Sequence, residues 1–91
     1  MYRVEWKDEA LEGLAEIGLI GKKIKDRVEN ELVKNPKGQG SPLTGDLKNL
    51  WSYRCYGRYR VVYQILETKL LIIVVEAGRR KNIYRKLSRK S

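Results

Sequence analysis

The sequence predicts an α+β fold in which a small antiparallel sheet is covered on one face by two N-terminal helices. Three observations predict it: an alternating strand pattern in the first six residues, two amphipathic helical stretches after it, and three strand-like segments in the second half. The expected order is β-α-α-β-β-β, with a further short helix possible in the C-terminal tail. A chain of 91 residues is expected to form one domain, residues 1–91, with a thin core.

The N-terminal half supplies a strand and two helices. Tyr2, Val4 and Trp6 alternate with charged residues, which is typical of a half-buried strand. Asp8 stands where the N-cap of a first helix belongs, and Gly18 is expected to close that helix.

The second helix is expected from about Ile20 to Lys34. Its apolar residues recur every four positions, at Ile20, Ile24, Val28 and Leu32. Asn35-Pro36 should end it, because the residue before a proline avoids the helical region.

The C-terminal half reads as a set of strands joined by short turns. Lys37–Pro42 is the one loop-like stretch and leads to strands at Leu50–Tyr56 and Tyr59–Leu66, joined by a tight turn at Gly57-Arg58. A second turn precedes Leu70–Val75, which is apolar on both faces, as a central strand is. Gly78 is expected to break this strand.

Charge is concentrated in the second half of the chain. Residues 1–45 carry eight Lys/Arg and eight acids, whereas residues 46–91 carry twelve and three, so the second half holds the whole formal charge of +9. Such a one-sided field is typical of proteins that bind nucleic acid or an acidic partner. The alternative interpretation is that the basic residues are surface charges that only keep the protein soluble.

Composition also excludes several kinds of chemistry. Histidine is absent and Cys55 is the single cysteine, so imidazole catalysis, Cys/His metal sites and an internal disulfide are ruled out. No carboxylate spacing suggests a metal site, and we expect no cofactor. The sequence shows no signal-peptide core, and its longest apolar run is too short to span a membrane. We therefore expect a cytoplasmic protein with no membrane partner.

Two arginines on neighbouring expected strands form the first candidate site. Arg54 and Arg60 flank the Gly57-Arg58 turn, so they are expected to be cross-strand neighbours. Like charges in that position repel each other unless they share an anion, which favours a phosphate site; the alternative is two outward-facing, solvated side chains. Further candidates follow the last strand, at Arg79, Arg80, Lys81 and Tyr84.

These residues resemble the RelE/ParE superfamily of toxins. The resemblance is carried, in order, by Leu43-Thr-Gly-Asp-Leu-Lys48, Leu50-Trp-Ser-Tyr-Arg54, Tyr59-Arg-Val-Val-Tyr63, and Ala77-Gly-Arg-Arg-Lys81 followed by Tyr84-Arg85. It spans nearly the whole chain. It implies the toxin component of a type II toxin–antitoxin system and, in the RelE-like branch, a ribosome-dependent, metal-independent mRNA endoribonuclease. In that reaction the ribose 2′-OH attacks the adjacent phosphorus.

The resemblance also implies roles for individual residues. Arg60 matches the arginine that binds the scissile phosphate. Arg80 matches one that stabilises the transition state or protonates the leaving group, with Arg79 its near-equivalent if the register differs by one. Tyr84 matches a tyrosine that stacks on a base or assists the 2′-OH, and Arg54 matches a basic residue that aids proton transfer. Further RNA contacts are expected at Lys48, Arg58, Arg79, Lys81 and Arg85.

One departure keeps alternatives open. Ser52 stands where the best-studied members carry a lysine, Lys48 is a possible substitute, and Arg54 is a poor general base because its pKa exceeds about 12. A ParE-like inhibitor of DNA gyrase, a non-catalytic RNA- or ribosome-binding module, and a degenerate toxin that only pairs with its antitoxin are the alternatives.

The expected partners also follow from the resemblance. They are an antitoxin with an acidic or amphipathic helical segment, the ribosomal A site with its mRNA, and operator DNA bound through the antitoxin.

Overall fold

The computed structural model describes residues 1–79 and Ile83. Three short 3-10 helices, η1 (Leu32–Lys34), η2 (Gly45–Leu47) and η3 (Glu67–Lys69), lie between the longer elements. Those longer elements are, in order, β1 (Arg3–Trp6), α1 (Asp8–Glu16), α2 (Leu19–Asn30), α3 (Pro36–Gln39), β2 (Ser41–Pro42), β3 (Trp51–Cys55), β4 (Tyr59–Leu66) and β5 (Leu71–Arg79). The α+β class and the two N-terminal helices are as predicted; the C-terminal helix falls outside the described residues.

The sheet is mixed, not purely antiparallel. Its strand order is β1-β5-β4-β3-β2, and β1 pairs in parallel with β5 while the other pairs are antiparallel. Side-chain alternation is the same in both kinds of pair, so the sequence pattern could not reveal the direction of β1. β5 lies between β1 and β4, which explains why this strand is apolar on both faces.

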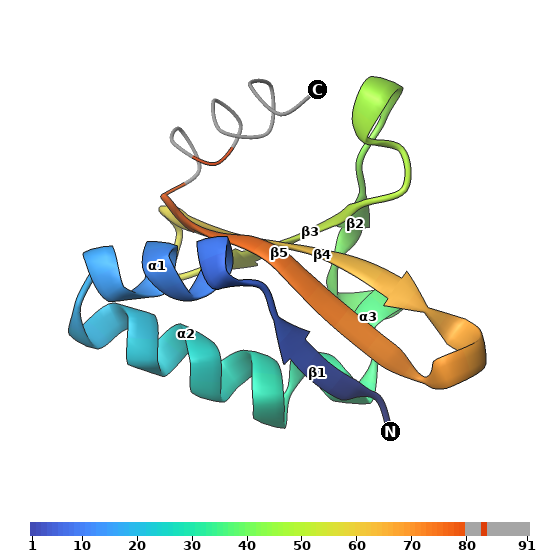
Figure 1. The fold of residues 1–91 in the computed structure, drawn as a ribbon, viewed down its shortest axis with the longest axis horizontal. Helices are drawn as coiled ribbons and strands as arrows, with labels where there is room; N and C mark the ends of the chain where they lie inside the picture. The colour runs from blue at the N-terminus through green and yellow to red at the C-terminus, as the bar shows by residue number, and fades with distance from the viewer. Residues whose placement is uncertain (80–82, 84–91) are drawn as a thin grey trace.

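Helices α1 and α2 lie side by side against one face of the sheet (Figure 1). Their apolar stripes meet the sheet in the main core, because residues three or four apart share one face of a helix. The buried members of this core are Ala10, Leu14, Ile24, Val28, Leu32, Val33, Tyr53, Cys55, Val61, Tyr63, Ile72, Val74 and Ala77.

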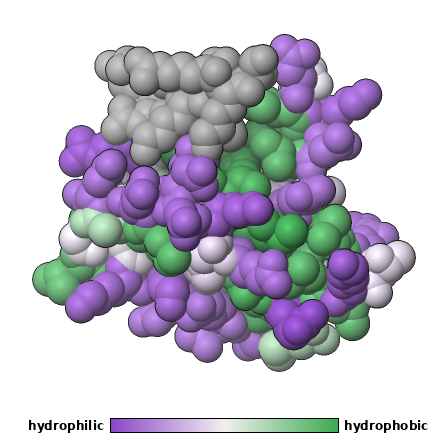
Figure 2. Space-filling model, viewed as in Figure 1, coloured by the Kyte–Doolittle hydropathy of each residue, from purple (hydrophilic) through white to green (hydrophobic). Residues whose placement is uncertain are grey.

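On the opposite face of the sheet, which we call the open face, the described residues form a much smaller apolar cluster. Val62 and Ile83 are buried there, with Leu43, Leu47, Leu50 and Val75 packed around them. Figure 2 shows hydrophilic side chains interspersed with hydrophobic ones over the described part of the surface.

Several predicted boundaries in the helical half are wrong. Lys7 occupies the N-cap of α1 and Asp8 is its first residue, where the carboxylate still favours the positive helix end. The second helix is shorter than expected, since α2 ends at Asn30 and η1 continues the chain to Lys34. The buried stripe nevertheless runs through both, which is why the periodicity did not show the change of helix type.

The expected loop at Lys37–Pro42 is also wrong. Pro36 begins α3, and the side chain of Asn35 accepts a hydrogen bond of 3.1 Å from the Gly38 amide as its N-cap. Strand β2 then pairs with β3 through Ser41 and Pro42. Proline at the first helical position with asparagine before it was an available signal.

Gly78 does not break the last strand. β5 continues to Arg79, and Gly78 pairs with Arg60 at a φ of 149°, a conformation that favours glycine. The turn between β3 and β4 holds Tyr56 and Gly57 at positive φ, so it begins one residue before the predicted pair. The predicted limits of β4 and of the Glu67–Lys69 turn match the structure.

Candidate functional site

Arg54 and Arg60 face each other on the open face of the sheet. The sequence predicts them to be cross-strand neighbours, and the structure makes their Cα atoms direct partners in the β3–β4 pairing. Tyr53 and Cys55 turn into the main core, so alternation sends Arg54 to the other side. Arg54 is exposed and Arg60 is half-buried. Two cations thus share one cross-strand position, which is unfavourable unless an anion lies between them.

A cavity of about 260 Å³ surrounds this pair. It is lined by Gln39, Ser41, Leu43, Ser52, Arg54 and Arg60. The buried Nε of Arg60 has no hydrogen-bond partner among the described residues. A buried guanidinium N–H without an acceptor is costly, and a phosphate oxygen is a strong acceptor for it. We call this cavity the arginine pocket.

Sequence reasoning missed one wall of the arginine pocket. Gln39 and Ser41 come from α3 and β2, the stretch that was expected to be a loop. Sequence reasoning also did not single out Glu76. This residue is 1% exposed and pairs with Val62, so its side chain lies on the open face. A single acid within an apolar strand was the signal for it.

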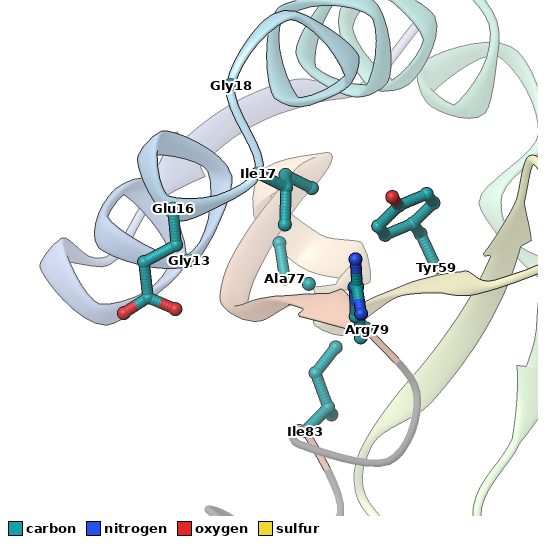
Figure 3. Close-up of a pocket in the computed structure, with 9 residues that line it drawn as sticks. Gly13, Glu16, Ile17, Gly18, Tyr59, Ala77, Arg79 and Ile83 are labelled. Carbon is teal, nitrogen blue, oxygen red and sulfur yellow. The ribbon is translucent and has the colours of Figure 1, made fainter.

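Arg79 does not join the arginine pocket. It pairs with Tyr59, whereas the preceding residue, Gly78, pairs with Arg60. Neighbouring residues of a strand point to opposite faces, so Arg79 lies on the helix-covered side at the same end of the sheet. There it lines a separate cavity of about 440 Å³ with Tyr59 and the end of α1 (Figure 3).

The remaining predicted residues are spread out or lie outside the described part. Lys48 is exposed at the C-cap of η2 and is not among the residues that line the arginine pocket. Arg58 is exposed in the β3–β4 turn. Arg80, Lys81, Tyr84 and Arg85 fall outside the described residues. The described structure thus brings together Arg54 and Arg60, with Ser52 beside them.

Cys55 and the strand aromatics belong to the core. Cys55 is 1% exposed, and burial raises the pKa of its thiol to about 11. Burial likewise raises the pKa of Tyr63, whose hydroxyl donates a 2.6 Å hydrogen bond to the Pro36 carbonyl. Burial, and then the neighbouring Cys55, raise the pKa of Tyr53. A thiol that stays protonated at neutral pH is a poor nucleophile.

The described residues contain neither a metal-binding group of side chains nor a membrane-spanning helix. No group of three or more acidic, histidine or cysteine side chains is arranged to hold a metal ion within residues 1–79 and 83. None of the helices in that part of the chain is long and apolar enough to cross a membrane.

Several solved structures with a similar fold are toxins or toxin–antitoxin complexes. A chain of the RelBE2 complex from Mycobacterium tuberculosis superposes with a TM-score of 0.80 at 24% identity, covering 87% of this chain and 98% of that one. The isolated RelE toxin of E. coli gives 0.71 at 20% identity, with 99% and 98% covered. The YoeB/ParE toxin of Agrobacterium tumefaciens gives 0.70 at 21% identity, with 88% and 99% covered. The fold is therefore the RelE/ParE toxin fold.

The family follows from the sequence itself. Residues 11–88 match the family described as ParE-like toxin of type II bacterial toxin–antitoxin system. The chain belongs to this family, and it is a toxin of a type II toxin–antitoxin system. No curated protein matches the sequence.

Proposed function

We propose that this toxin is an mRNA endoribonuclease that acts in the ribosomal A site and that the arginine pocket holds the scissile phosphate. The observation that carries the proposal is the direct cross-strand pairing of Arg54 with Arg60 around a cavity on the open face. Arginine forks suit the phosphoryl oxygens, on which negative charge accumulates during the reaction. The buried Nε of Arg60 gives one donor for such an oxygen.

The division of roles follows from exposure. Arg60 is half-buried and held in mid-strand, so it fixes the phosphate, while the exposed Arg54 has the freedom to follow charge as it develops. Ser52 lines the same cavity and its hydroxyl is suited to a hydrogen bond with ribose or phosphate. Arg80 and Tyr84 are proposed to complete the site by stabilising the transition state and by stacking on a base or assisting the 2′-OH. The reaction needs no metal in this scheme.

Induction in a bacterial host tests the proposal. The wild-type toxin should stop growth and leave mRNA cut within codons, as read by primer extension. Arg60→Ala should restore growth and leave transcripts intact, while Arg3→Ala, which removes an exposed arginine on β1 away from the arginine pocket, should remain toxic. Purified ribosomes with a short mRNA should show the same order of activities. Binding to ribosomes without any cleavage would contradict the proposal and support a non-catalytic module.

Inhibition of DNA gyrase is the second candidate function. Two observations favour it: the family match is to ParE-like toxins, and Ser52 takes the place of an expected lysine. In that case induced cells should accumulate gyrase-linked DNA breaks while their mRNA stays whole. A supercoiling assay with purified gyrase separates the two functions directly.

We further propose that the antitoxin covers the arginine pocket with an acidic or amphipathic segment. The charge of +9 arises in residues 46–91, which include both pocket arginines, and opposite charge favours association with such a segment. Through that antitoxin the complex would bind operator DNA. Addition of the antitoxin should abolish cleavage, and salt should weaken the complex.

A further inference from the structure

The second cavity, which we call the edge cavity, lies beside the last residues of β5, past the point where β1 ends. β1 stops at Trp6, which pairs with Val74, so the last residues of β5 extend past it. α1 takes the place of β1 there: Gly13 packs so closely that a Cβ at this position would overlap the carbonyl oxygen of Ala77. Past the end of α1 at Glu16, a hollow of about 440 Å³ remains beside β4 and β5.

The lining of the edge cavity combines a ring, a cation and a short apolar floor. Tyr59 and Arg79 stand next to each other on one side in Figure 3, and Ile17 and Ala77 lie across from them. Glu16 adds a carboxylate at the α1 rim, turned away from the tyrosine (Figure 3). Tyr59 is half-buried and Arg79 is exposed, so the ring is held in place while the guanidinium is accessible to a ligand.

We infer that the edge cavity binds a nucleobase of the RNA strand whose phosphate occupies the arginine pocket; this rests on the proposed function. An aromatic ring beside a guanidinium is the pairing on which single-stranded RNA bases stack. One cation and one carboxylate leave the rim close to neutral, which suits the donor and acceptor groups of a base better than an acidic peptide. The volume is in the range of small-ligand sites, roughly 300–1,000 Å³.

The chain connectivity places the two sites within reach of one strand. Tyr59 and Arg60 are neighbours in β4, and so are Arg79 and Gly78 in β5, with each pair pointing to opposite faces. Beyond Val74 the edge of β5 has no pairing with β1, and α1 packs against it at Gly13, so the hollow between the two faces lies past the end of α1. In this proposal an RNA strand follows that end of the sheet, with a phosphate on the open face and an adjoining base in the edge cavity.

Titration of the ¹⁵N-labelled toxin with AMP tests the site without requiring cleavage. Millimolar AMP should shift the backbone amide signals of Gly13, Gly18 and Gly78, which line the cavity. Tyr59→Leu removes the ring and keeps apolar volume, and it should weaken AMP binding about fivefold or more. Arg79→Gln, at an exposed position, should weaken it similarly. Arg60→Ala should leave these shifts unchanged.

A cleavage assay on ribosomes then tests whether the base that binds in the edge cavity belongs to mRNA or to a free nucleotide. Tyr59→Leu and Arg79→Gln should raise the KM for mRNA with kcat retained, whereas Arg60→Ala should abolish turnover. If wild type shows no cleavage but AMP still shifts the three glycines, the proposed nuclease fails and the nucleobase site stands. An unchanged KM in both variants would overturn the assignment to RNA in favour of a free nucleotide.

Three other results would overturn the site itself. Ribose 5-phosphate or inorganic phosphate could shift the same glycine amides with the affinity of AMP, which would show an anion site with no base recognition. A glutamate-rich peptide could bind there more tightly than AMP, which would show a protein-docking site. AMP could instead shift only the amides of Ser52 and Arg54, or none at all.

Discussion

Replacing Arg54 by glutamine should make the free toxin more stable at low salt. Arg54 and Arg60 occupy directly paired positions on β3 and β4. Glutamine keeps a polar side chain at this exposed position and removes one of the two like charges. The substitution thus removes repulsion while it buries or exposes little apolar surface.

The size of the effect follows from the geometry of the pair. Like charges directly opposite each other on a sheet cost roughly 0.2–1 kcal/mol, and the exposure of Arg54 places this pair in the middle of that range. We expect Arg54→Gln to raise the free energy of unfolding by about 0.5 kcal/mol at low ionic strength. In about 1 M salt the Debye length falls to roughly 3 Å, so the gain should disappear.

Urea denaturation followed by circular dichroism, at low and at high NaCl, measures this difference. Arg58→Gln is the matched control, because Arg58 is exposed in the adjoining turn and therefore has no residue opposite it in the β3–β4 pairing. The same Arg54→Gln protein should bind a short RNA more weakly and with a shallower salt dependence. A loss of stability of the Arg54→Gln protein at low salt, or an equal gain in Arg58→Gln, would refute the proposed repulsion between Arg54 and Arg60.

Three further predictions concern the scaffold that positions the site. Gly13→Ala should lower the free energy of unfolding by about 1–3 kcal/mol although alanine favours helices, because the new Cβ would overlap the Ala77 carbonyl oxygen; thermal and urea melts measure it. Tyr63→Phe should cost roughly 1–2 kcal/mol in the same melts, because it leaves the buried Pro36 carbonyl without its 2.6 Å hydrogen bond. The pKa of Cys55 is about 11 in the fold against 9.0 in the unfolded chain, so its contribution to stability is fully present below pH 9 and is lost as the pH rises toward 11; urea melts across that range should show a loss of about 2–3 kcal/mol.

Each of these three predictions has a control. Ala15→Gly, at an exposed position of the same helix, should lower the free energy of unfolding by about 1 kcal/mol, which measures helix propensity alone. If Gly13→Ala instead stabilised the protein by a similar amount, the tight contact with the Ala77 carbonyl oxygen would be disproved. Tyr59→Phe removes a hydroxyl from a half-buried tyrosine and should change stability less than Tyr63→Phe. Cys55→Ala should flatten the profile between pH 9 and 11, and a slope unchanged in that variant would assign it to other groups.

The sequence by itself determined the α+β class, the limits of β4, the placement of Arg54 and Arg60 on neighbouring strands and the resemblance to RelE/ParE toxins. The class and the strand limits depend on local periodicity. The direct opposition of Arg54 and Arg60 depends on the three-residue turn 56–58, because the predicted two-residue turn would have placed Arg54 opposite Val61. The burial of Cys55 was predictable in the same way, since aromatic neighbours and strand alternation place it in the core.

Only the tertiary structure decided which groups of distant segments meet. It paired β1 in parallel with β5, brought Gln39 and Ser41 from an expected loop to the wall of the arginine pocket, and placed Arg79 on the other face from Arg60. The physical reason is that a strand's alternation gives two faces without saying which is covered. That choice depends on where α1 and α2 pack, and the continuation of β5 through Gly78 fixed the side of Arg79.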